Sequence, residues 1–495
     1  MRRHTCILVL AVFGWLLSLG QAPAQQYAFT NYAGQPGTPG ATDGTLADSR
    51  FNQPSGLAVD AEGHLFVAHY FNHTIRRIST NGLVSTVAGI PGQSGFVDGP
   101  AAEARFNQPS FLAFDAGGNL YVSELLNNAI RKITKAGVVS TYAGGLGQFN
   151  RPAGLAFDTV GNLFVADSAN HVIRLVTPGG LVLTLAGSVG DGGTTDGPAA
   201  SARFYYPTDV TLDAAGNLFV SDAGNDTIRK ISPAGIVSTV AGAPRQKAAV
   251  DGFGGAARFY QPYIIRFDAA GNLVVADSGN YTLRRISPAG EVTTIAGQAG
   301  QAGTADGIGT AARFFNPGYI AFDAMGTLYV ADAFNHRISR GTIVAGFPQI
   351  TVEPASLTFG SAGTALTVTA TGNAPLTYQW RLNGTNLPNA TNATLAVAGV
   401  AANAGSYRVA VANSVGSVTS AEAFLSFLDG PRFFASVSLS GILGRQYRVD
   451  AAEILNATTN WLTLTNLTLT TNPTTVIDPT SAGATNRYYR AVLLP

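Results

Sequence analysis

The stretch "PTDVTLDAAGNLFVSDAGNDTIRKISPAGIVSTVAG", from Pro207 to Gly242, decides the fold. It contains four short segments rich in β-branched and aromatic residues, "VTLD", "NLFVSD", "TIRKIS" and "IVSTVAG", with Gly or Asn at the turns between them. The turn that holds Asp213, Gly216 and Asn217 suits a hairpin, because Gly tolerates a positive φ and Asp or Asn bonds its own backbone. The stretch therefore predicts four antiparallel strands in one sheet.

The same pattern recurs along the chain at a nearly constant period. Complete units span 50–89, 105–144, 148–187, 203–242 and 258–297, and a further unit begins at Arg313. Their anchoring prolines, spaced 55, 43, 55, 55 and 55 residues apart, are Pro54, Pro109, Pro152, Pro207, Pro262 and Pro317. A fixed period of this length is typical of repeat architectures in which each unit packs on its neighbours. We expect an all-β chain dominated by a six-bladed β-propeller.

The last unit is incomplete, and its missing part lies at the other end of the chain. After Ile338 the unit loses the repeat pattern and lacks a fourth strand. The segment "YAFTNYAG", Tyr27–Gly34, matches a fourth strand and leads into Arg50 as the equivalent segments do elsewhere. We expect this N-terminal strand to pair with the last blade and close the ring, which leaves no long sheet edge exposed.

Units such as "DAAGNLVVADSGNYTLRRISPAGEVTTIAG", which begins at Asp268, resemble the NHL repeat family. The resemblance covers about 27–346, and it implies a propeller without implying one activity. WD40 repeats fit less well, because no Trp-Asp dipeptide occurs and Trp15, Trp380 and Trp461 all lie outside these units.

The N-terminus has the pattern of a signal peptide. Arg2 and Arg3 precede an apolar run, and Ala22-Pro23-Ala24 provides a small-residue cleavage site before Gln25. We expect residues 1–24 to be removed and the protein to be secreted, periplasmic or on the cell surface, with no membrane span after cleavage. Cleavage removes the single cysteine, Cys6, and takes the formal charge from +1 to −1. This balance gives no electrostatic reason to expect nucleic acid as a partner.

Beyond the propeller, which we assign to 25–347, a second pattern begins. Residues 348–428 resemble an immunoglobulin-like domain, in which Trp380 would be the core tryptophan and Tyr407 the tyrosine-corner residue. Val368 and Val409 stand about where the usual cysteine pair would be, so the domain is cysteine-free. Residues 429–495 contain short alternating segments such as "GRQYRVDAA", and we expect a small β-module there.

Most residues with chemical potential recur with the repeat, so we interpret them as structural. His73, His171 and His336 share one repeat position, and a ring of acids, Glu124, Asp167, Asp222, Asp277 and Asp332, shares another. Each of these acids is expected to bond the backbone of its own loop. A third set, Asp43, Asp98, Asp196, Asp251 and Asp306, lies seven residues before an arginine and suggests an Asp–Arg pair or an Asp turn. We assign no catalytic residue, metal ligand or cofactor.

Positions where the repeats differ are the better candidates for a site. Four residues after the anchoring proline, Arg266 replaces the small residues of the other units. The first two residues after the prolines also vary, and Phe111, Asp209, Tyr263 and Tyr319 stand out there, where other units have Gly, Ser or Ala. The structural interpretation is that these residues reflect variation in packing and that Arg266 is exposed to solvent. The functional interpretation is a ligand site at one mouth of the channel, on the face where the inter-blade loops rise, beside a notch left by the short loop at 145–148.

The hypothesis that we favour is a non-catalytic exported recognition protein that binds a protein, peptide or glycan on its propeller. The alternative is an exported metal-dependent hydrolase or lyase with its site at the channel mouth. Converging carboxylates or imidazoles at that mouth would distinguish the second from the first.

Overall fold

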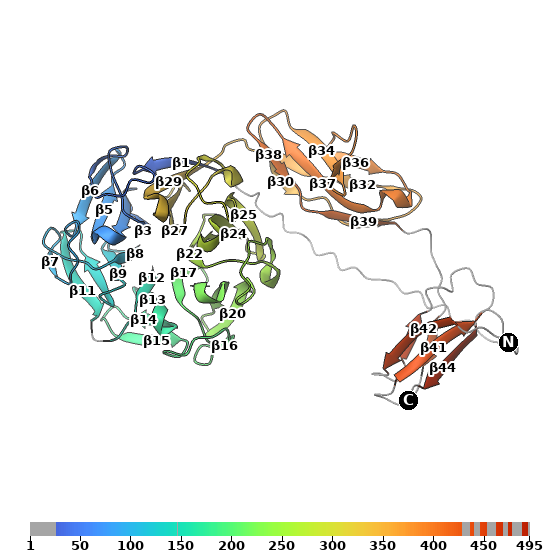
Figure 1. The fold of residues 1–495 in the computed structure, drawn as a ribbon, viewed down its shortest axis with the longest axis horizontal. Coiled ribbons are helices and arrows are strands. Elements are labelled where there is room, and N and C mark those ends of the chain that lie inside the picture. The colour runs from blue at the N-terminus through green and yellow to red at the C-terminus, as the bar shows by residue number, and fades with distance from the viewer. Residues whose placement is uncertain are drawn as a thin grey trace. The chain divides into compact units, whose positions relative to one another are not determined.

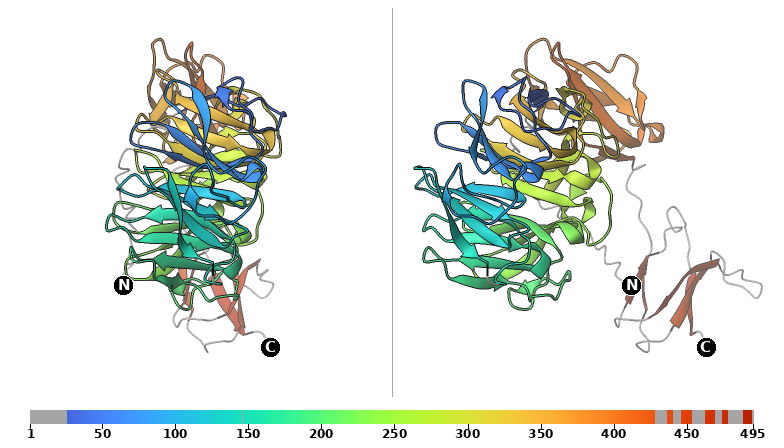
Figure 2. Two further views of the ribbon diagram at one scale, coloured as in Figure 1. Left: turned by 90° about the vertical axis from the view of Figure 1, so that its left-hand side faces the viewer. Right: turned by 60° about the vertical axis from the view of Figure 1, so that its left-hand side comes forward.

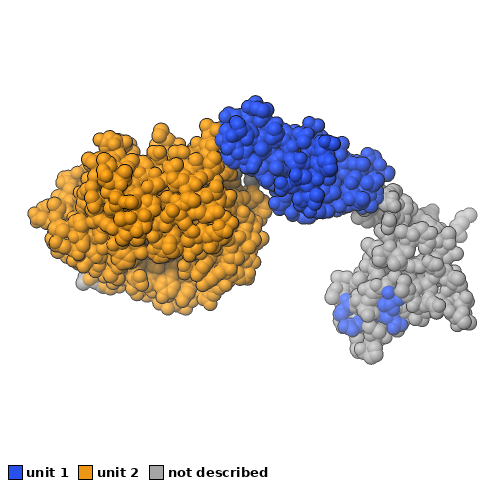
Figure 3. All heavy atoms as spheres, turned by 45° about the horizontal axis from the view of Figure 1, so that its top comes forward, with its two compact units in different colours: residues 1–23, 346–495 blue, residues 24–345 orange. Residues whose placement is uncertain are grey.

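The computed structural model describes residues 26–145 and 147–427, together with strands β40 (Ser436–Leu439), β41 (Gln446–Ala452), β42 (Leu462–Thr468), β43 (Thr474–Ile477) and β44 (Tyr488–Leu493). The predicted signal peptide lies outside these residues. The chain divides into two compact units, one of which spans Ala24–Ala345 and the other of which includes Gly346–Pro495 (Figure 3). Among the described residues, the helices are single 3₁₀ turns, and none is long and apolar enough to cross a membrane.

The first unit is a β-propeller of repeated antiparallel sheets, which we call blades and name after their innermost strands (Figure 1). The β3 blade holds β3 (Pro54–Val59), β4 (Leu65–His69), β5 (Thr74–Ile78), β6 (Leu83–Ala88) and β2 (Gly44–Thr45). The β8 blade holds β8 (Pro109–Phe114), β9 (Leu120–Glu124), β10 (Ala129–Ile133), β11 (Val138–Gly144) and β7 (Gly99–Pro100). The β12 blade holds β12 (Pro152–Phe157), β13 (Leu163–Asp167), β14 (Val172–Val176) and β15 (Val182–Ala186).

The remaining blades follow the same order from the inside outward. The β17 blade holds β17 (Pro207–Leu212), β18 (Leu218–Asp222), β19 (Thr227–Ile231), β20 (Ile236–Ala241) and β16 (Gly197–Pro198). The β22 blade holds β22 (Pro262–Phe267), β23 (Leu273–Asp277), β24 (Thr282–Ile286), β25 (Glu291–Gly297) and β21 (Gly252–Phe253). The β27 blade holds β27 (Pro317–Phe322), β28 (Leu328–Asp332), β29 (Arg337–Ile343), β1 (Tyr27–Ala33) and β26 (Gly307–Ile308). Each innermost strand contacts that of the next blade, and β27 contacts β3. Figure 2 shows the blades of the propeller from two further directions.

The predicted closure by the N-terminal strand is confirmed. Strand β1 pairs antiparallel with β29, so that Ala28 faces Thr342 and Thr30 faces Arg340. Its alternate side chains Tyr27 and Phe29 are only 3% and 2% exposed, and the Phe29 ring meets Phe314 edge-on at 5.2 Å. Strand β1 therefore contributes both backbone pairing and core side chains to the β27 blade.

The β12 blade has four strands where its neighbours have five, because the loop that leads into it is short. In the other blades this loop is long enough to carry a two-residue outer strand. The segment 145–148 is too short to do so, and Leu146 within it lies outside the described residues. The outer edge of this blade is therefore less covered than that of its neighbours.

The second unit is built from short strands around Trp380. Its main sheet contains β31 (Leu357–Phe359), β39 (Ala423–Phe427), β37 (Gly405–Ala412), β34 (Thr377–Leu382), β35 (Thr385–Asn386) and β38 (Ser417–Thr419). Two further pairs join β30 (Gln349–Val352) to β33 (Thr369–Thr371) and β32 (Thr364–Thr367) to β36 (Thr394–Val397). The buried Trp380 donates its indole N–H to the Asn392 carbonyl at 2.8 Å, and the Tyr407 hydroxyl donates to the Asn403 carbonyl at 2.8 Å.

Candidate functional site

Asp209 and Arg266, two of the predicted site residues, form an ion pair between neighbouring blades. An Arg266 guanidinium nitrogen lies 2.5 Å from Asp209 Oδ2, which also accepts the Ile265 backbone N–H at 2.9 Å. The Asp209 side chain is fully buried and that of Arg266 is 21% exposed. Burial raises the pKa of Asp209 to about 6, although the nearby Arg266 charge acts to lower it. Asp209 therefore already engages the Arg266 guanidinium group, which the sequence-based hypothesis assigned to a ligand.

Arg266 and Tyr263 lie toward different ends of strand β22. Arg266 pairs with Val274 near the β22–β23 turn, whereas Pro262, next to Tyr263, pairs with Asp277 where the strand β23 ends. Three residues of a strand span about 10 Å. The expectation that Arg266 lies on the face of the inter-blade loops is therefore wrong, because those loops enter each blade at the proline end of the innermost strand.

Phe111, Tyr263 and Tyr319 come together from three different blades. Phe111 lies 4.8 Å from Tyr319 and 6.0 Å from Tyr263, and Tyr263 lies 5.5 Å from Tyr319, all measured between ring centroids. Phe111 and Tyr319 are buried, and the Tyr319 hydroxyl shares a 2.6 Å hydrogen bond with Ser110. We call these three rings the aromatic cluster. Their mutual packing leaves Tyr263 as the member that also reaches a cavity.

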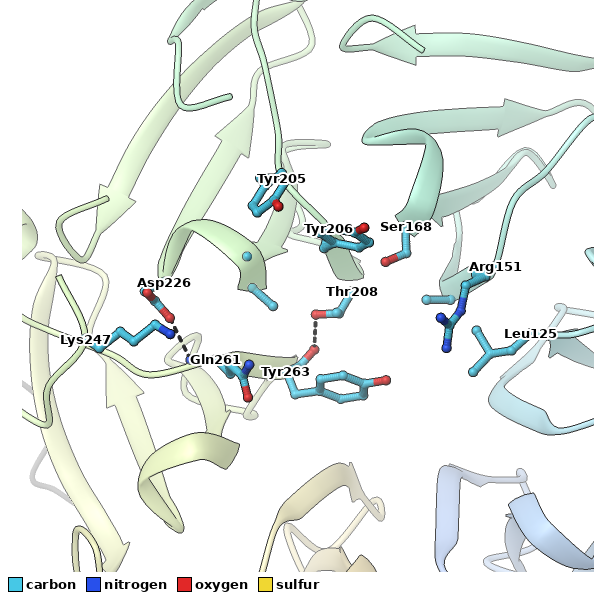
Figure 4. Close-up of a pocket in the computed structure, with 13 residues that line it drawn as sticks. Leu125, Arg151, Ser168, Tyr205, Tyr206, Thr208, Asp226, Lys247, Gln261 and Tyr263 are labelled. Carbon is cyan, nitrogen blue, oxygen red and sulfur yellow. Dashed lines mark hydrogen bonds between the residues drawn. The ribbon is translucent and has the colours of Figure 1, made fainter. Parts of the chain in front are cut away.

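The cavity beside Tyr263 has a volume of about 440 Å³, and we call it the mouth pocket (Figure 4). It lies over the loop ends of the β12, β17 and β22 blades, and Leu125 of the β8 blade also borders it. The other residues that line it are Arg151, Ala153, Ser168, Tyr205, Tyr206, Thr208, Ala223, Gly224, Asp226, Lys247, Gln261 and Tyr263. Its size and its mixture of aromatic and polar groups are those of a small-molecule site.

Aromatic rings on one side of the mouth pocket are held in place by the backbone. Tyr205 packs against Gly224, where an added Cβ would lie 2.3 Å from the Tyr205 carbonyl oxygen and 2.6 Å from its ring. The neighbouring Tyr206 meets the Tyr205 ring edge-on at 4.9 Å and is 44% exposed. In Figure 4 these two rings lie across the pocket from Tyr263. The pocket therefore offers aromatic surface on opposite sides.

The charged groups of the mouth pocket lie at its two ends (Figure 4). Arg151 is exposed at one end, beside Leu125. At the other end Asp226 is only 1% exposed, and its Oδ1 accepts the Gln261 backbone N–H at 2.9 Å. Burial raises the pKa of Asp226, while the Gln261 bond and the Lys247 charge act to lower it. The pocket thus combines an exposed cation, Arg151, with a buried carboxylate, Asp226, beside which Lys247 lies.

The repeated histidines act between blades. The Nδ1 atoms of His73, His171 and His336 accept backbone N–H groups of the next blade at 3.1–3.2 Å. Asn128 and Asp226 do the same from the equivalent position at 2.8 and 2.9 Å. We call these five contacts the inter-blade latches. Their donors, all with positive φ, are Gln53, Gln108, Arg151, Tyr206 and Gln261.

The repeated acids are structural too, but the expectation that each bonds the backbone of its own loop is wrong. Each accepts a backbone N–H seventeen residues earlier, as Asp222 does from Tyr205 at 2.7 Å. Glu124, Asp222, Asp277 and Asp332 also pair with a buried arginine of the same blade. The acids that lie seven residues before an arginine differ from the expectation. Asp196, for example, pairs with Arg229 at 2.5 Å and not with Arg203, which lies seven residues after it. The Arg203 side chain instead donates to nearby carbonyls and to Asp191.

Two other places among the described residues are candidates for a ligand. Asp60, Glu62 and His64 cluster in the β3–β4 turn with ligand atoms within 4.8 Å of one another, but His64 Nδ1 and Asp60 Oδ2 already pair at 2.9 Å. A second cavity of about 650 Å³ lies among the turns of the β17 and β22 blades. Its acids Asp213 and Asp268 are committed to hydrogen bonds within their own turns. The mouth pocket is therefore the stronger candidate.

The sequence prediction missed Arg151, Tyr206 and Asp226, although a signal for them was present. The residue directly before each anchoring proline varies, as Gln53, Gln108, Arg151, Tyr206, Gln261 and Asn316. Asp226 likewise stands where three units have histidine. Comparing the repeats at these loop positions, and not only along the innermost strand, would have selected the pocket.

Fold and site together define a β-propeller with a pocket at one mouth, and its repeats are similar to those of NHL repeat-containing proteins. No protein-family model matches the chain. NHL repeat-containing protein 2 of Bos taurus is 29% identical over 316 residues, which are 61% of this chain and 40% of that protein. The chain thus spans well under two thirds of the length of the curated relatives that it matches.

Two solved structures from Bacteroides share the fold. One, a structural genomics protein of unknown function from Bacteroides thetaiotaomicron VPI-5482, is 22% identical with a TM-score of 0.54, and the match covers 65% of this chain and 77% of that one. The other, an auxiliary nutrient binding protein from Bacteroides ovatus ATCC 8483, is 18% identical with a TM-score of 0.51, and the match covers 64% and 77%. At these identities the similarity establishes the fold alone.

Proposed function

We propose that the protein is an exported, non-catalytic recognition protein that binds a ligand in the mouth pocket. The observation that carries the proposal is the convergence of Arg151, Tyr206 and Asp226 on one cavity, at loop positions where the repeats differ. The name of the Bacteroides ovatus relative, an auxiliary nutrient binding protein, is compatible with this role. Export rests on the signal-peptide pattern of residues 1–24.

The rest of the architecture serves this role as follows. The propeller has six blades and carries the pocket, and the unit after it is an immunoglobulin-like domain that acts as a spacer or attachment. The buried Trp380 and the Tyr407–Asn403 hydrogen bond support this second assignment, since both occur in immunoglobulin folds. Residues 429–495 form a small β-module. The alternative function, a metal-dependent hydrolase or lyase, requires metal bound at the mouth, which elemental analysis of the purified protein would detect.

The test is a binding screen of the mature chain, residues 25–495, on glycan and peptide arrays, followed by calorimetry with each hit. Tyr206→Gln is the informative variant, because Gln53, Gln108 and Gln261 occupy the same position with the same positive φ. The variant should weaken binding of the hit about tenfold or more while its melting temperature stays unchanged, since loss of a stacked ring costs about 1–3 kcal/mol.

Phe71→Gln is the matched control. Phe71 is an aromatic residue with 43% exposure in the 3₁₀ turn η1 (Tyr70–Asn72) of the β3 blade, and it does not line the pocket. Full affinity in Tyr206→Gln, together with a loss in Phe71→Gln, would place the binding surface elsewhere and contradict the proposal.

A further inference from the structure

The cation at one end of the mouth pocket is Arg151. Arg151 has no ion-pair partner among the residues that the structure describes, and its side chain is exposed. Its backbone is fixed, because its N–H donates to Asn128 Oδ1 at 2.8 Å. A guanidinium presents a planar fork of donors that matches a carboxylate in two parallel hydrogen bonds. This end of the pocket is therefore suited to a carboxylate.

At the other end of the pocket, one carboxylate oxygen of Asp226 lacks a hydrogen-bond donor among the described residues. Asp226 Oδ2 is buried and has no hydrogen-bond partner among the described residues, while Oδ1 is used by the Gln261 N–H. A buried acceptor without a donor costs free energy that a ligand O–H group would recover. Lys247 borders the same end and disfavours a second cation there. The missing donor is therefore a hydroxyl group in preference to an ammonium group.

Between the two ends, the ligand meets flat aromatic surface. Tyr206 and Tyr205 lie on one side and Tyr263 on the other (Figure 4). Thr208 lines the same space, and its hydroxyl already donates to the Tyr263 carbonyl at 2.7 Å, which ties the two walls together. The C–H faces of a pyranose ring pack well on such tyrosine rings, whose apolar bodies carry a polar tip.

We propose that the mouth pocket binds an acidic sugar, a pyranose whose carboxylate meets Arg151 and whose hydroxyl groups donate to Asp226. This proposal deepens the proposed function and rests on it. It disfavours amino acids and peptide N-termini as ligands, because their ammonium group would face Lys247. It also separates the ligand from neutral sugars, which leave Arg151 without a counterpart.

The experiment is calorimetry of residues 25–495 with glucuronate and galacturonate, and with glucose, galactose and 4-hydroxybenzoate as comparison ligands. We expect a uronate to bind at least about tenfold more tightly than the neutral sugar of the same configuration. Arg151→Gln should abolish that preference. Glutamine is tolerated at this position, since Gln53 and Gln108 occupy it in other units. Asp226→Asn keeps the latch, as Asn128 does, but puts a donor where the ligand needs an acceptor, and it should weaken uronate about tenfold or more.

The control is Lys135→Gln, which removes one exposed positive charge in the β10–β11 turn and should change nothing. No uronate binding, equal binding of uronate and neutral sugar, or equal binding of 4-hydroxybenzoate would overturn the acidic-sugar proposal. If a neutral glycan or a peptide then binds and Tyr206→Gln abolishes that binding, the proposed function stands without it. If no ligand binding depends on Tyr206, the proposed function fails as well.

Discussion

The pair of Asp209 and Arg266 shows how two unusual residues in a repeat can compensate for each other. Asp209 stands where two of the other units have glycine, and Arg266 stands where four of the other units have alanine and one has threonine. Each would be costly alone, because a fully buried carboxylate needs a partner and only a cation of the next blade supplies it. The pair thus accounts for Arg266 through packing between blades, and a ligand-binding role for it stays a prediction.

The first prediction concerns this pair. Arg266→Ala leaves Asp209 buried without its charge partner and with Oδ1 already unpaired, so it should destabilise the propeller by about 3–5 kcal/mol. The double variant Asp209→Ala and Arg266→Ala removes both charges and should recover much of that loss. Thermal unfolding of the three proteins measures both effects. Equal melting temperatures for the parent and Arg266→Ala, with loss of ligand binding, would restore the sequence-based interpretation.

The histidines of the inter-blade latches make the stability of the propeller depend on pH, and substitution can measure their contribution. Burial lowers the pKa of His73, His171 and His336 below the ordinary value of 6.5. In the folded chain they are neutral and accept through Nδ1, whereas in the unfolded chain they titrate near 6.5. The unfolded state therefore binds more protons below about pH 6.5, so stability is lost as the pH falls through that range.

The second prediction follows from this loss of stability at low pH. Replacing all three histidines with Asn, the residue found at Asn128, keeps an acceptor that does not titrate. The triple variant should lose less stability than the parent between pH 7 and pH 5, measured as midpoints of urea unfolding. The comparison cancels the buried acids, Glu124 among them, because they are the same in both proteins. Parallel pH profiles would show that the latches do not titrate.

At the scale of the element, β1 is the strand on which the ring depends. It is separated from its partner β29 by about three hundred residues of chain, yet it supplies the pairing that the last blade lacks. Tyr27 and Phe29 are almost fully buried in the same cluster as Phe314. Removing β1 would expose this apolar surface along with the edge of β29.

The third prediction tests the strand by a single residue and by deletion. Phe29→Ala should destabilise the propeller by about 3–5 kcal/mol, because it empties a buried aromatic site. Thr30→Ala, at an exposed position of the same strand, should stay within about 0.5 kcal/mol of the parent. Deletion of residues 25–34 should lower the melting temperature further, and a synthetic peptide of that sequence should restore it. A deletion variant that melts with the parent would refute closure by β1.

The elements were predictable because their signals are local and repeated. Proline positions, turn glycines and β-branched runs specify each blade, and the match of "YAFTNYAG" to a fourth strand predicted the pairing of β1 with β29. The partner of Asp196 was not predictable in this way. The carboxylate reaches Arg229, which is 33 residues away in sequence, and the nearer Arg203 turns to carbonyl groups. Which of two arginines a side chain reaches depends on side-chain direction, which spacing does not encode.

At the scale of the whole molecule, the division near Ala345 predicts that the propeller is independent. The fourth prediction is that residues 25–346 fold alone, because each blade packs on its neighbouring blades. Its thermal transition should coincide, within about 3 °C, with one transition of residues 25–495. Scanning calorimetry of both proteins provides the measurement. An insoluble or non-cooperative fragment would contradict the boundary.

The mouth pocket could be predicted only in part, for a reason that belongs to the whole ring. Tyr263 was predicted from one strand, but the pocket is lined from four blades, and the loops that carry Arg151 and Asp226 meet only when their consecutive blades pack against each other. Substitutions along one strand are visible in a sequence comparison of repeats. Whether residues from different units lie close together depends on the order of the blades and on which end of its strand each residue occupies.

The pairing of β1 with β29 also sets an order of events in time. The first strand of the propeller to be synthesised is the last to find its place, because its partner follows about three hundred residues later. At roughly 5–20 residues per second, β1 waits on the order of tens of seconds with Tyr27 and Phe29 uncovered. During that interval every other blade can assemble, but the ring stays open. A newly made propeller therefore carries its main aggregation hazard at β1 and at the unpaired edge of β29, and a molecular chaperone would be most effective there.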